Sequence, residues 1–110
     1  MKTIVTTVTD KKITMKIIST KKSAKDYKNQ ELTLKDFTVY EKGDSRISAL
    51  VTQDASGNEI IFSSSSNAIA DTLEMLVDVF EKNENAEPLV FSIEECESKQ
   101  GRKYLTMNIK

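Results

Sequence analysis

The sequence predicts a single, mainly β domain with one helix, and three observations lead to this prediction. A chain of 110 residues with 38% hydrophobic and 30% charged residues has the size and composition of one folded domain. Several short segments alternate apolar and polar side chains with the period of two that is typical of half-buried strands. One longer segment, residues 67–83, carries apolar residues at helical spacing instead.

Residues 1–31 are expected to form a basic N-terminal extension of strand and loop. Residues 3–19 are rich in Thr, Ile and Val on either side of a polar centre, which predicts two strands or one interrupted strand. Residues 20–31 are polar and rich in Lys, which predicts an exposed loop. Residues 1–31 hold eight Lys against three acidic residues, a net charge of +5, whereas residues 32–110 hold eight Lys or Arg against fourteen acidic residues, a net charge of −6. The extension therefore places a local positive field on a nearly neutral molecule.

The rest of the chain reads as strand, strand, strand, helix, strand, strand. Residues 32–42 and 47–52 alternate as strands, and residues 54–58 have the composition of a hairpin turn that leads into a partner strand, 59–63. Ser66 or Asn67 can cap the helix, whose apolar stripe contains Ile69, Leu73, Leu76, Val77 and Phe80. The alternating patterns of residues 89–93 and 104–109 predict two strands that form a last hairpin.

This order of elements is that of the five-stranded oligonucleotide-binding (OB) barrel, β-β-β-α-β-β. We therefore expect residues 1–110 to form one OB-fold-like domain, in which residues 1–31 are the N-terminal β extension. The turn of the last hairpin, residues 98–103, is strongly basic, and Gly101 can supply the positive backbone angle that such a turn needs.

Alternation along three of the strands predicts a nucleic-acid-binding surface. If Phe37 and Val39, then Ile47, Ala49 and Val51, and finally Leu105 and Met107 point into the core, the opposite face collects Tyr40, Lys42, Arg46, Arg102 and Tyr104. The basic turn adds Lys99 and Lys103, and the loop lysines Lys21 and Lys22 extend the positive field. Aromatic rings stack on bases while cations follow phosphates, so this composition predicts a site for single-stranded nucleic acid. The alternative is that the aromatic residues favour strands and the cations keep the sheet edges soluble.

Missing residue types exclude several classes of function. The chain has no His and a single Cys, Cys96, so neither a Cys/His zinc site nor a Ser-His-Asp or Cys-His catalytic group can form. No glycine-rich phosphate motif is present. We expect no enzymatic activity, no metal and no cofactor. The sequence also shows no apolar run near the roughly 20 residues of a membrane span and no signal peptide, so we expect a cytoplasmic protein without membrane contact.

Three blocks of the sequence are similar to one protein family. Residues 34–42, 62–65 and 98–106 resemble small single-stranded DNA-binding proteins encoded by bacteriophages of Gram-positive hosts. The resemblance implies an OB barrel that coats single-stranded DNA during phage DNA replication or recombination in the host cytoplasm, without catalysis. It also implies that the basic turn and Tyr104 belong to the DNA-contacting region, with replication or recombination proteins as partners.

Two features leave the nature of the partners open. Bacterial single-stranded DNA-binding proteins end in a flexible acidic tail, whereas residues 107–110 here read as the end of a strand. The acidic excess after residue 31 favours an alternative function, a protein-interaction module that inhibits or modulates a host nucleic-acid-processing factor. In either case an open sheet edge at the first or last strand could pair with a second copy, so we expect a homo-oligomer.

Overall fold

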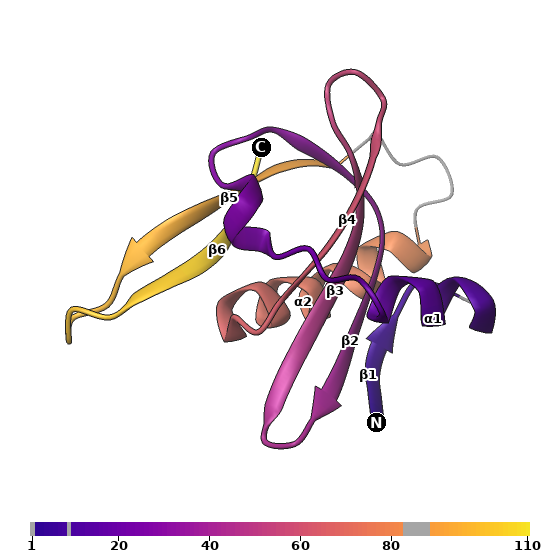
Figure 1. Ribbon diagram of the computed structural model, residues 1–110, viewed down its shortest axis with the longest axis horizontal. Coiled ribbons are helices and arrows are strands. Elements are labelled where there is room, and N and C mark those ends of the chain that lie inside the picture. Colours follow the sequence, from indigo (N-terminus) through magenta and orange to yellow (C-terminus); the bar gives the residue numbers. More distant parts are fainter. Residues whose placement is uncertain (1, 9, 83–88) are drawn as a thin grey trace.

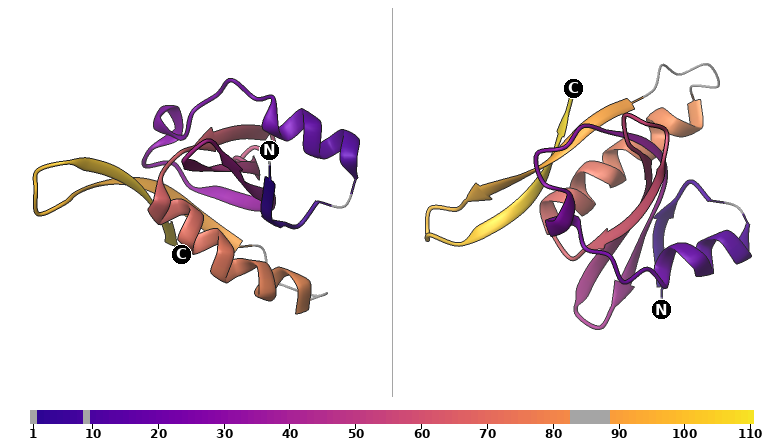
Figure 2. Two further views of the ribbon diagram at one scale, coloured as in Figure 1. Left: turned by 90° about the horizontal axis from the view of Figure 1, so that it is seen from below. Right: turned by 45° about the horizontal axis from the view of Figure 1, so that its top comes forward.

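The computed structural model describes residues 2–8, 10–82 and 89–110 as one antiparallel sheet with helices on both faces (Figures 1 and 2). The described residues form six strands, which are β1 (Lys2–Thr6), β2 (Leu32–Lys42), β3 (Ser45–Gln53), β4 (Glu59–Ser64), β5 (Leu89–Glu97) and β6 (Lys103–Ile109). The helices are α1 (Lys11–Ile18), α2 (Asn67–Lys82) and the short 3₁₀ helix η1 (Ala24–Tyr27). The mainly β class is confirmed. Residue 83, the expected end of the long helix, lies outside the described residues.

The strand order is β4-β3-β2-β5-β6, and β1 also pairs with β2. One edge of β2 is shared: Leu32–Leu34 pairs with β5, and the stretch from Thr38 to Glu41 pairs with β1. The register of β2 against β3 shifts between Leu34 and Asp36, and a bulge of this kind bends a strand. In the part of the chain that the structure describes, no pairing joins β4 to β6, so the sheet does not close into a barrel.

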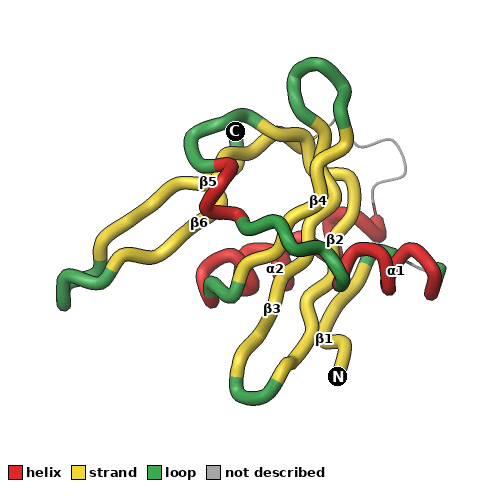
Figure 3. Tube along the Cα trace, viewed as in Figure 1, coloured by secondary structure: helices red, strands yellow, loops and turns green. Residues whose placement is uncertain are grey.

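Residues 22–29 lie beside this opening between β4 and β6 and bridge β4 to β5. The backbone N–H of Ser63 on β4 donates to the carbonyl of Lys22 at 3.0 Å, and the N–H of Asn29 donates to the carbonyl of Ile93 on β5 at 2.8 Å. The ring of Tyr27 stacks on Phe62, with ring centroids 5.3 Å apart. The segment predicted as an exposed loop is therefore docked on the sheet, as the tube in Figure 3 shows.

Two apolar clusters hold the helices against the sheet. The larger cluster packs α2 on one face and includes Phe37, Leu50, Phe62, Leu73 and Phe91. The smaller cluster packs α1 on the other face and includes Val8, Ile17, Tyr40, Ala49 and Val51. Because β3 contributes to both clusters, apolar side chains on β3 are buried on both of its faces.

The prediction of a single helix was wrong, because residues 11–18 form α1 where strands were expected. The side chain of Asp10 accepts a hydrogen bond from the backbone N–H of Lys12 at 2.8 Å and caps the helix. Ile17 is fully buried against the sheet. The β-branched residues of this segment favour a strand locally, but tertiary packing of one apolar side of the helix overrides that weak preference.

The turn between β3 and β4 provides a prediction for pH dependence. The Asp54 carboxylate accepts the backbone N–H groups of Asn58 and Ser56, each at 2.9 Å, and the Asn58 hydrogen bond is the main cause of the lowered pKa of Asp54. A carboxylate with a lowered pKa stabilises the fold above its unfolded pKa of about 3.9 and loses that contribution as the pH falls through the folded pKa. We expect Asp54→Asn to lower the melting temperature at neutral pH, with a deficit that shrinks as the pH falls below about 4.

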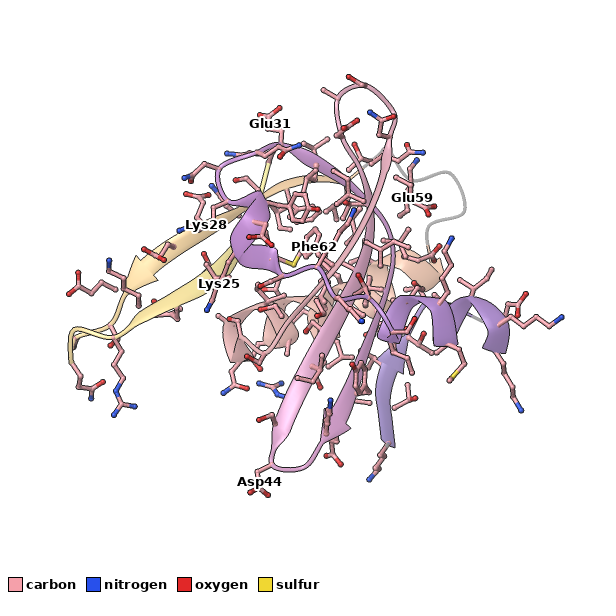
Figure 4. All side chains as sticks on the ribbon, in the orientation of Figure 1. Lys25, Lys28, Glu31, Asp44, Glu59 and Phe62 are labelled. Atoms are coloured by element: carbon pink, nitrogen blue, oxygen red, sulfur yellow. The ribbon has the colours of Figure 1, made fainter. Side chains whose placement is uncertain are left out.

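Thermal melts of the two proteins at a series of pH values would measure this deficit. Asp44→Asn is the matched control, because Asp44 occupies the tight turn between β2 and β3 (Figure 4) and its side chain has no hydrogen bond or ion pair among the described residues. A deficit that stays constant from acidic to neutral pH would contradict the role given to the Asp54 carboxylate.

Candidate nucleic-acid interface

A pocket of about 230 Å³ lies at the unclosed seam of the sheet, where β4 ends, α2 begins and β6 starts. We refer to it as the seam pocket. Its walls come from three separate parts of the chain, and its lining residues are Ser23, Lys25, Ser64, Ser65, Ser66, Lys103, Tyr104 and Leu105. None of these residues is acidic.

Serine hydroxyls fix the walls of the seam pocket. Ser66 caps α2 by accepting the N–H of Ile69 at 3.4 Å, and its own hydroxyl donates to the carbonyl of Leu105 on β6. The hydroxyl of Ser64 accepts the N–H of Ser66 at 3.0 Å. On the opposite wall, Ser23 accepts the N–H of Lys25 and begins η1. The serine run that the sequence placed before the helix thus connects β4 and α2 to β6.

The pocket combines cations, hydroxyl groups and an aromatic ring. Tyr104 is 42% exposed, and both Lys25 and Lys103 are exposed. Figure 4 shows Lys25 and Lys28 on the side of η1 that is nearer the β5–β6 hairpin. Ammonium and hydroxyl groups donate hydrogen bonds to phosphate oxygens, and an exposed phenol ring can stack on a base. The arrangement therefore suits an anionic ligand that carries planar rings.

Glu95 on β5 lies between two of the cations near the pocket. Its carboxylate is 3.4 Å from the ammonium of Lys28 and 3.8 Å from that of Lys103. These groups are partly exposed, so each pair stabilises the fold only weakly. Their electrostatic consequence is local, because Glu95 partly neutralises two lysines that a phosphate would otherwise contact.

The β5–β6 hairpin extends away from the rest of the sheet as an arm (Figure 1), and the tip of this arm is basic. Gly101 adopts a φ of 78° in the turn, and the N–H of Ser98 donates to the carbonyl of Arg102 at 2.8 Å. Lys99 and Arg102 are exposed and form no ion pair within the described residues. Their charges are therefore available to an external anion.

A second pocket of about 230 Å³ lies at the outer edge of β4, where residues 16–22 pass along this strand. It is lined by Lys16, Thr20, Lys22, Glu59 and Ile61. The hydroxyl of Thr20 donates to the carbonyl of Ile61, which holds this part of the N-terminal segment against β4. The exposed lysines Lys21 and Lys22 therefore precede Lys25 along one edge of the sheet.

Three of the predicted site residues do not belong to this surface, and two of these three are already held by other parts of the protein. Tyr40 is only 6% exposed and packs in the cluster beneath α1, and this burial raises the pKa of Tyr40. Arg46 forms ion pairs with Asp71, at 2.8 Å, and with Glu74, and the hydrogen bond that its guanidinium donates to Asp71 is the main cause of its raised pKa. The predictions that Tyr40 and Arg46 face outward as free binding groups were wrong.

These errors have two causes, because α1 covers the face on which Tyr40 lies and β3 turns Ala49 and Val51 toward that same face. Tyr40 pairs with Ile47, on the face that α1 covers, whereas Arg46 pairs with Glu41 on the opposite face. Lys42 is exposed but shares the face of Tyr40, and it lines a different pocket with Ile18. The expected set of five outward residues is thus divided between the two faces of the sheet.

The remaining predicted residues are all exposed, and the structure adds others that the sequence did not identify. Lys99, Arg102, Lys103 and Tyr104 belong to one hairpin, and Lys103 and Tyr104 line the seam pocket. Ser23, Lys25 and the serines from Ser64 to Ser66 complete it. The serine run and the Lys-rich loop were visible in the sequence, but their meeting depends on contacts between distant segments.

Comparison of the chain with family models, curated proteins and solved structures gave no match. The described part of the chain contains no group of three or more Cys, Asp or Glu placed to hold a metal ion. None of its helices has the length and apolar character needed to cross a membrane.

Proposed function

We propose that the protein binds single-stranded DNA at the seam pocket and along the basic tip of the β5–β6 hairpin. The observation that supports this most directly is the position of exposed Tyr104 beside Lys25 and Lys103, in a pocket without acidic lining. Cations and hydroxyl groups would contact the phosphates and the tyrosine ring would stack on a base. Stacking does not depend on base identity, so the binding has little sequence preference.

The strand order supports an OB-like relationship. In β4-β3-β2-β5-β6, the first strand after the N-terminal segment lies between the second and the fourth, as in an OB barrel, and α2 follows the third. We propose an OB-like domain that stays open between β4 and β6, where residues 22–29 bridge β4 to β5. The proposed role is to coat single-stranded DNA, without catalysis, during phage DNA replication or recombination in the cytoplasm of a bacterial host.

A titration of a fluorescent oligo-dT with the protein at several salt concentrations tests the proposal. Four contacts, from Lys25, Lys99, Arg102 and Lys103, give an expected slope of log K against log salt of about −3, since each phosphate contact on a single strand contributes about −0.7. We expect oligo-dA of the same length to bind with similar affinity and duplex DNA to bind more weakly. Absence of binding at low salt, or binding that does not respond to salt, would overturn the proposal.

A further inference from the structure

We propose that copies of this chain assemble head to tail, with α1 of one copy docked on α2 of the next. The inference depends on the outer faces of the two helices and not on DNA binding. Both helices bury one side against the sheet and leave apolar residues exposed on the other, and the charges around these residues are opposite in sign.

The outer side of α1 is apolar and basic. Ile17 is fully buried, whereas Met15 is 62% exposed and Ile13 is 47% exposed. The neighbouring exposed residues are three cations, Lys11, Lys12 and Lys16, of which Lys16 lies 3.7 Å from Glu59. Ile13 and Met15 are two positions apart, so they lie on the two borders of this outer face, with Lys12 and Lys16 between them. The outer face of α1 is therefore a basic surface with an apolar side chain on each border.

The outer side of α2 is apolar and acidic. Met75 is 71% exposed and Val79 is 49% exposed, whereas Leu73 on the opposite side is fully buried. Asp71 and Asp78 are exposed, and with Met75 and Val79 they fall at i, i+4, i+7 and i+8, which is one stripe of a helix. Asp71 also pairs with Arg46, so Asp78 is the freer of the two charges.

The two surfaces complement each other, but they cannot meet within one molecule. In the left view of Figure 2, α1 and α2 lie on opposite sides of the sheet. A contact between α1 of one copy and α2 of another is heterologous, and it leaves a free α1 at one end of the pair and a free α2 at the other. Such a contact repeats, so the expected product is a chain of copies and not a closed dimer.

Sedimentation velocity of the full chain without DNA measures the assembly directly. We expect the weight-average mass to rise with protein concentration and to fall with added salt, because the charged contacts are exposed. Lys12→Glu and Asp78→Lys are each expected to weaken association about tenfold, since each places like charges across the contact. Met75→Ser tests the apolar part of the contact without changing any charge. All three side chains are exposed, so we expect the variants to fold. Thermal melts check this expectation.

A mixture of the two charge variants gives the sharpest test. Each variant alone places a charge of the same sign opposite the altered position across the contact. In an equimolar mixture, the altered α1 of the first variant meets the altered α2 of the second, and the two unaltered helices also match. We expect the mixture to recover the association of the unmodified protein.

Two results would overturn the head-to-tail contact. The first is a protein that stays monomeric at every concentration up to about 1 mM. This result would mean that any association is weaker than a Kd of about 1 mM, which corresponds to about −4 kcal/mol. The second is self-association that neither charge variant changes, which would indicate pairing through the edge of β6 instead. Because no DNA is present, either failure leaves the proposed DNA binding untouched.

Discussion

Removing the charges of Lys25 and Lys103 together, by Lys25→Gln and Lys103→Gln, is expected to weaken binding of single-stranded oligo-dT about 60-fold at roughly 50 mM salt. The magnitude follows from counterion release, since each lost phosphate contact on a single strand removes a factor of about eight at that concentration. The two lysines flank the same pocket from different segments of the chain. The slope of log K against log salt should flatten by about 1.4 for the double variant.

Two further variants separate charge from stacking at the same pocket. Tyr104→Ala should cost on the order of 1–3 kcal/mol of binding free energy while leaving the salt slope unchanged, because it removes a ring and no charge. Glu95→Gln should act in the opposite direction and raise the affinity, since it frees Lys28 and Lys103 from a carboxylate 3.4 Å and 3.8 Å away. A gain of affinity is hard to obtain by damaging a fold, so this variant distinguishes a direct electrostatic effect from misfolding.

Lys42→Gln is the matched control for the lysine variants. Lys42 is exposed and carries the same charge, but it shares the face of Tyr40 and does not line the seam pocket. We expect its affinity and salt slope to stay within about twofold of the unmodified protein. Equal losses for Lys42→Gln and for the double variant would show that only the net charge matters and would contradict a defined site at the seam.

Local sequence patterns were sufficient to place the central strands and the long helix. The strand predicted at 32–42 is β2 with the same bounds, and the strand predicted at 59–63 differs from β4 by one residue. These elements combine an alternating or helical pattern with turn residues such as Asp54 and Gly57, which act over a few positions. The serine that caps α2 was also one of the two residues predicted for that role.

The elements that the sequence did not predict depend on contacts between distant segments. Ala49 and Val51 alternate with Leu50, but β3 is buried on both faces, so period-two alternation could not tell which face was the core. That error placed Arg46 on the predicted surface, whereas Tyr40 was placed there because α1, which covers it, was not predicted. The seam pocket was missed for a similar reason, because Lys25 reaches it only when residues 22–29 dock beside β4.

Packing of α1, the helix that the sequence did not predict, also gives the largest expected effect on stability. Ile17→Ala is expected to lower the free energy of unfolding by about 2–5 kcal/mol, because Ile17 is fully buried in the cluster between α1 and the sheet. Urea denaturation followed by circular dichroism measures the change. Met15→Ala on the same helix is the control, because Met15 is 62% exposed and its truncation should change stability by less than about 0.5 kcal/mol.

The ionisation of Tyr40 reports separately whether α1 covers the sheet. Burial raises the pKa of Tyr40, so the stability that its neutral ring contributes is complete below the unfolded pKa of about 10 and is lost as the pH rises through the folded pKa. In a Tyr27→Phe/Tyr104→Phe background, Tyr40 is the only tyrosine left and its phenolate absorbance can be followed alone. Ile17→Ala should loosen the cover and lower the pKa of Tyr40, whereas Met15→Ala should leave it unchanged. Identical titrations for both variants would mean that packing of α1 does not bury Tyr40, and the outer face of the sheet would then be open to a ligand after all.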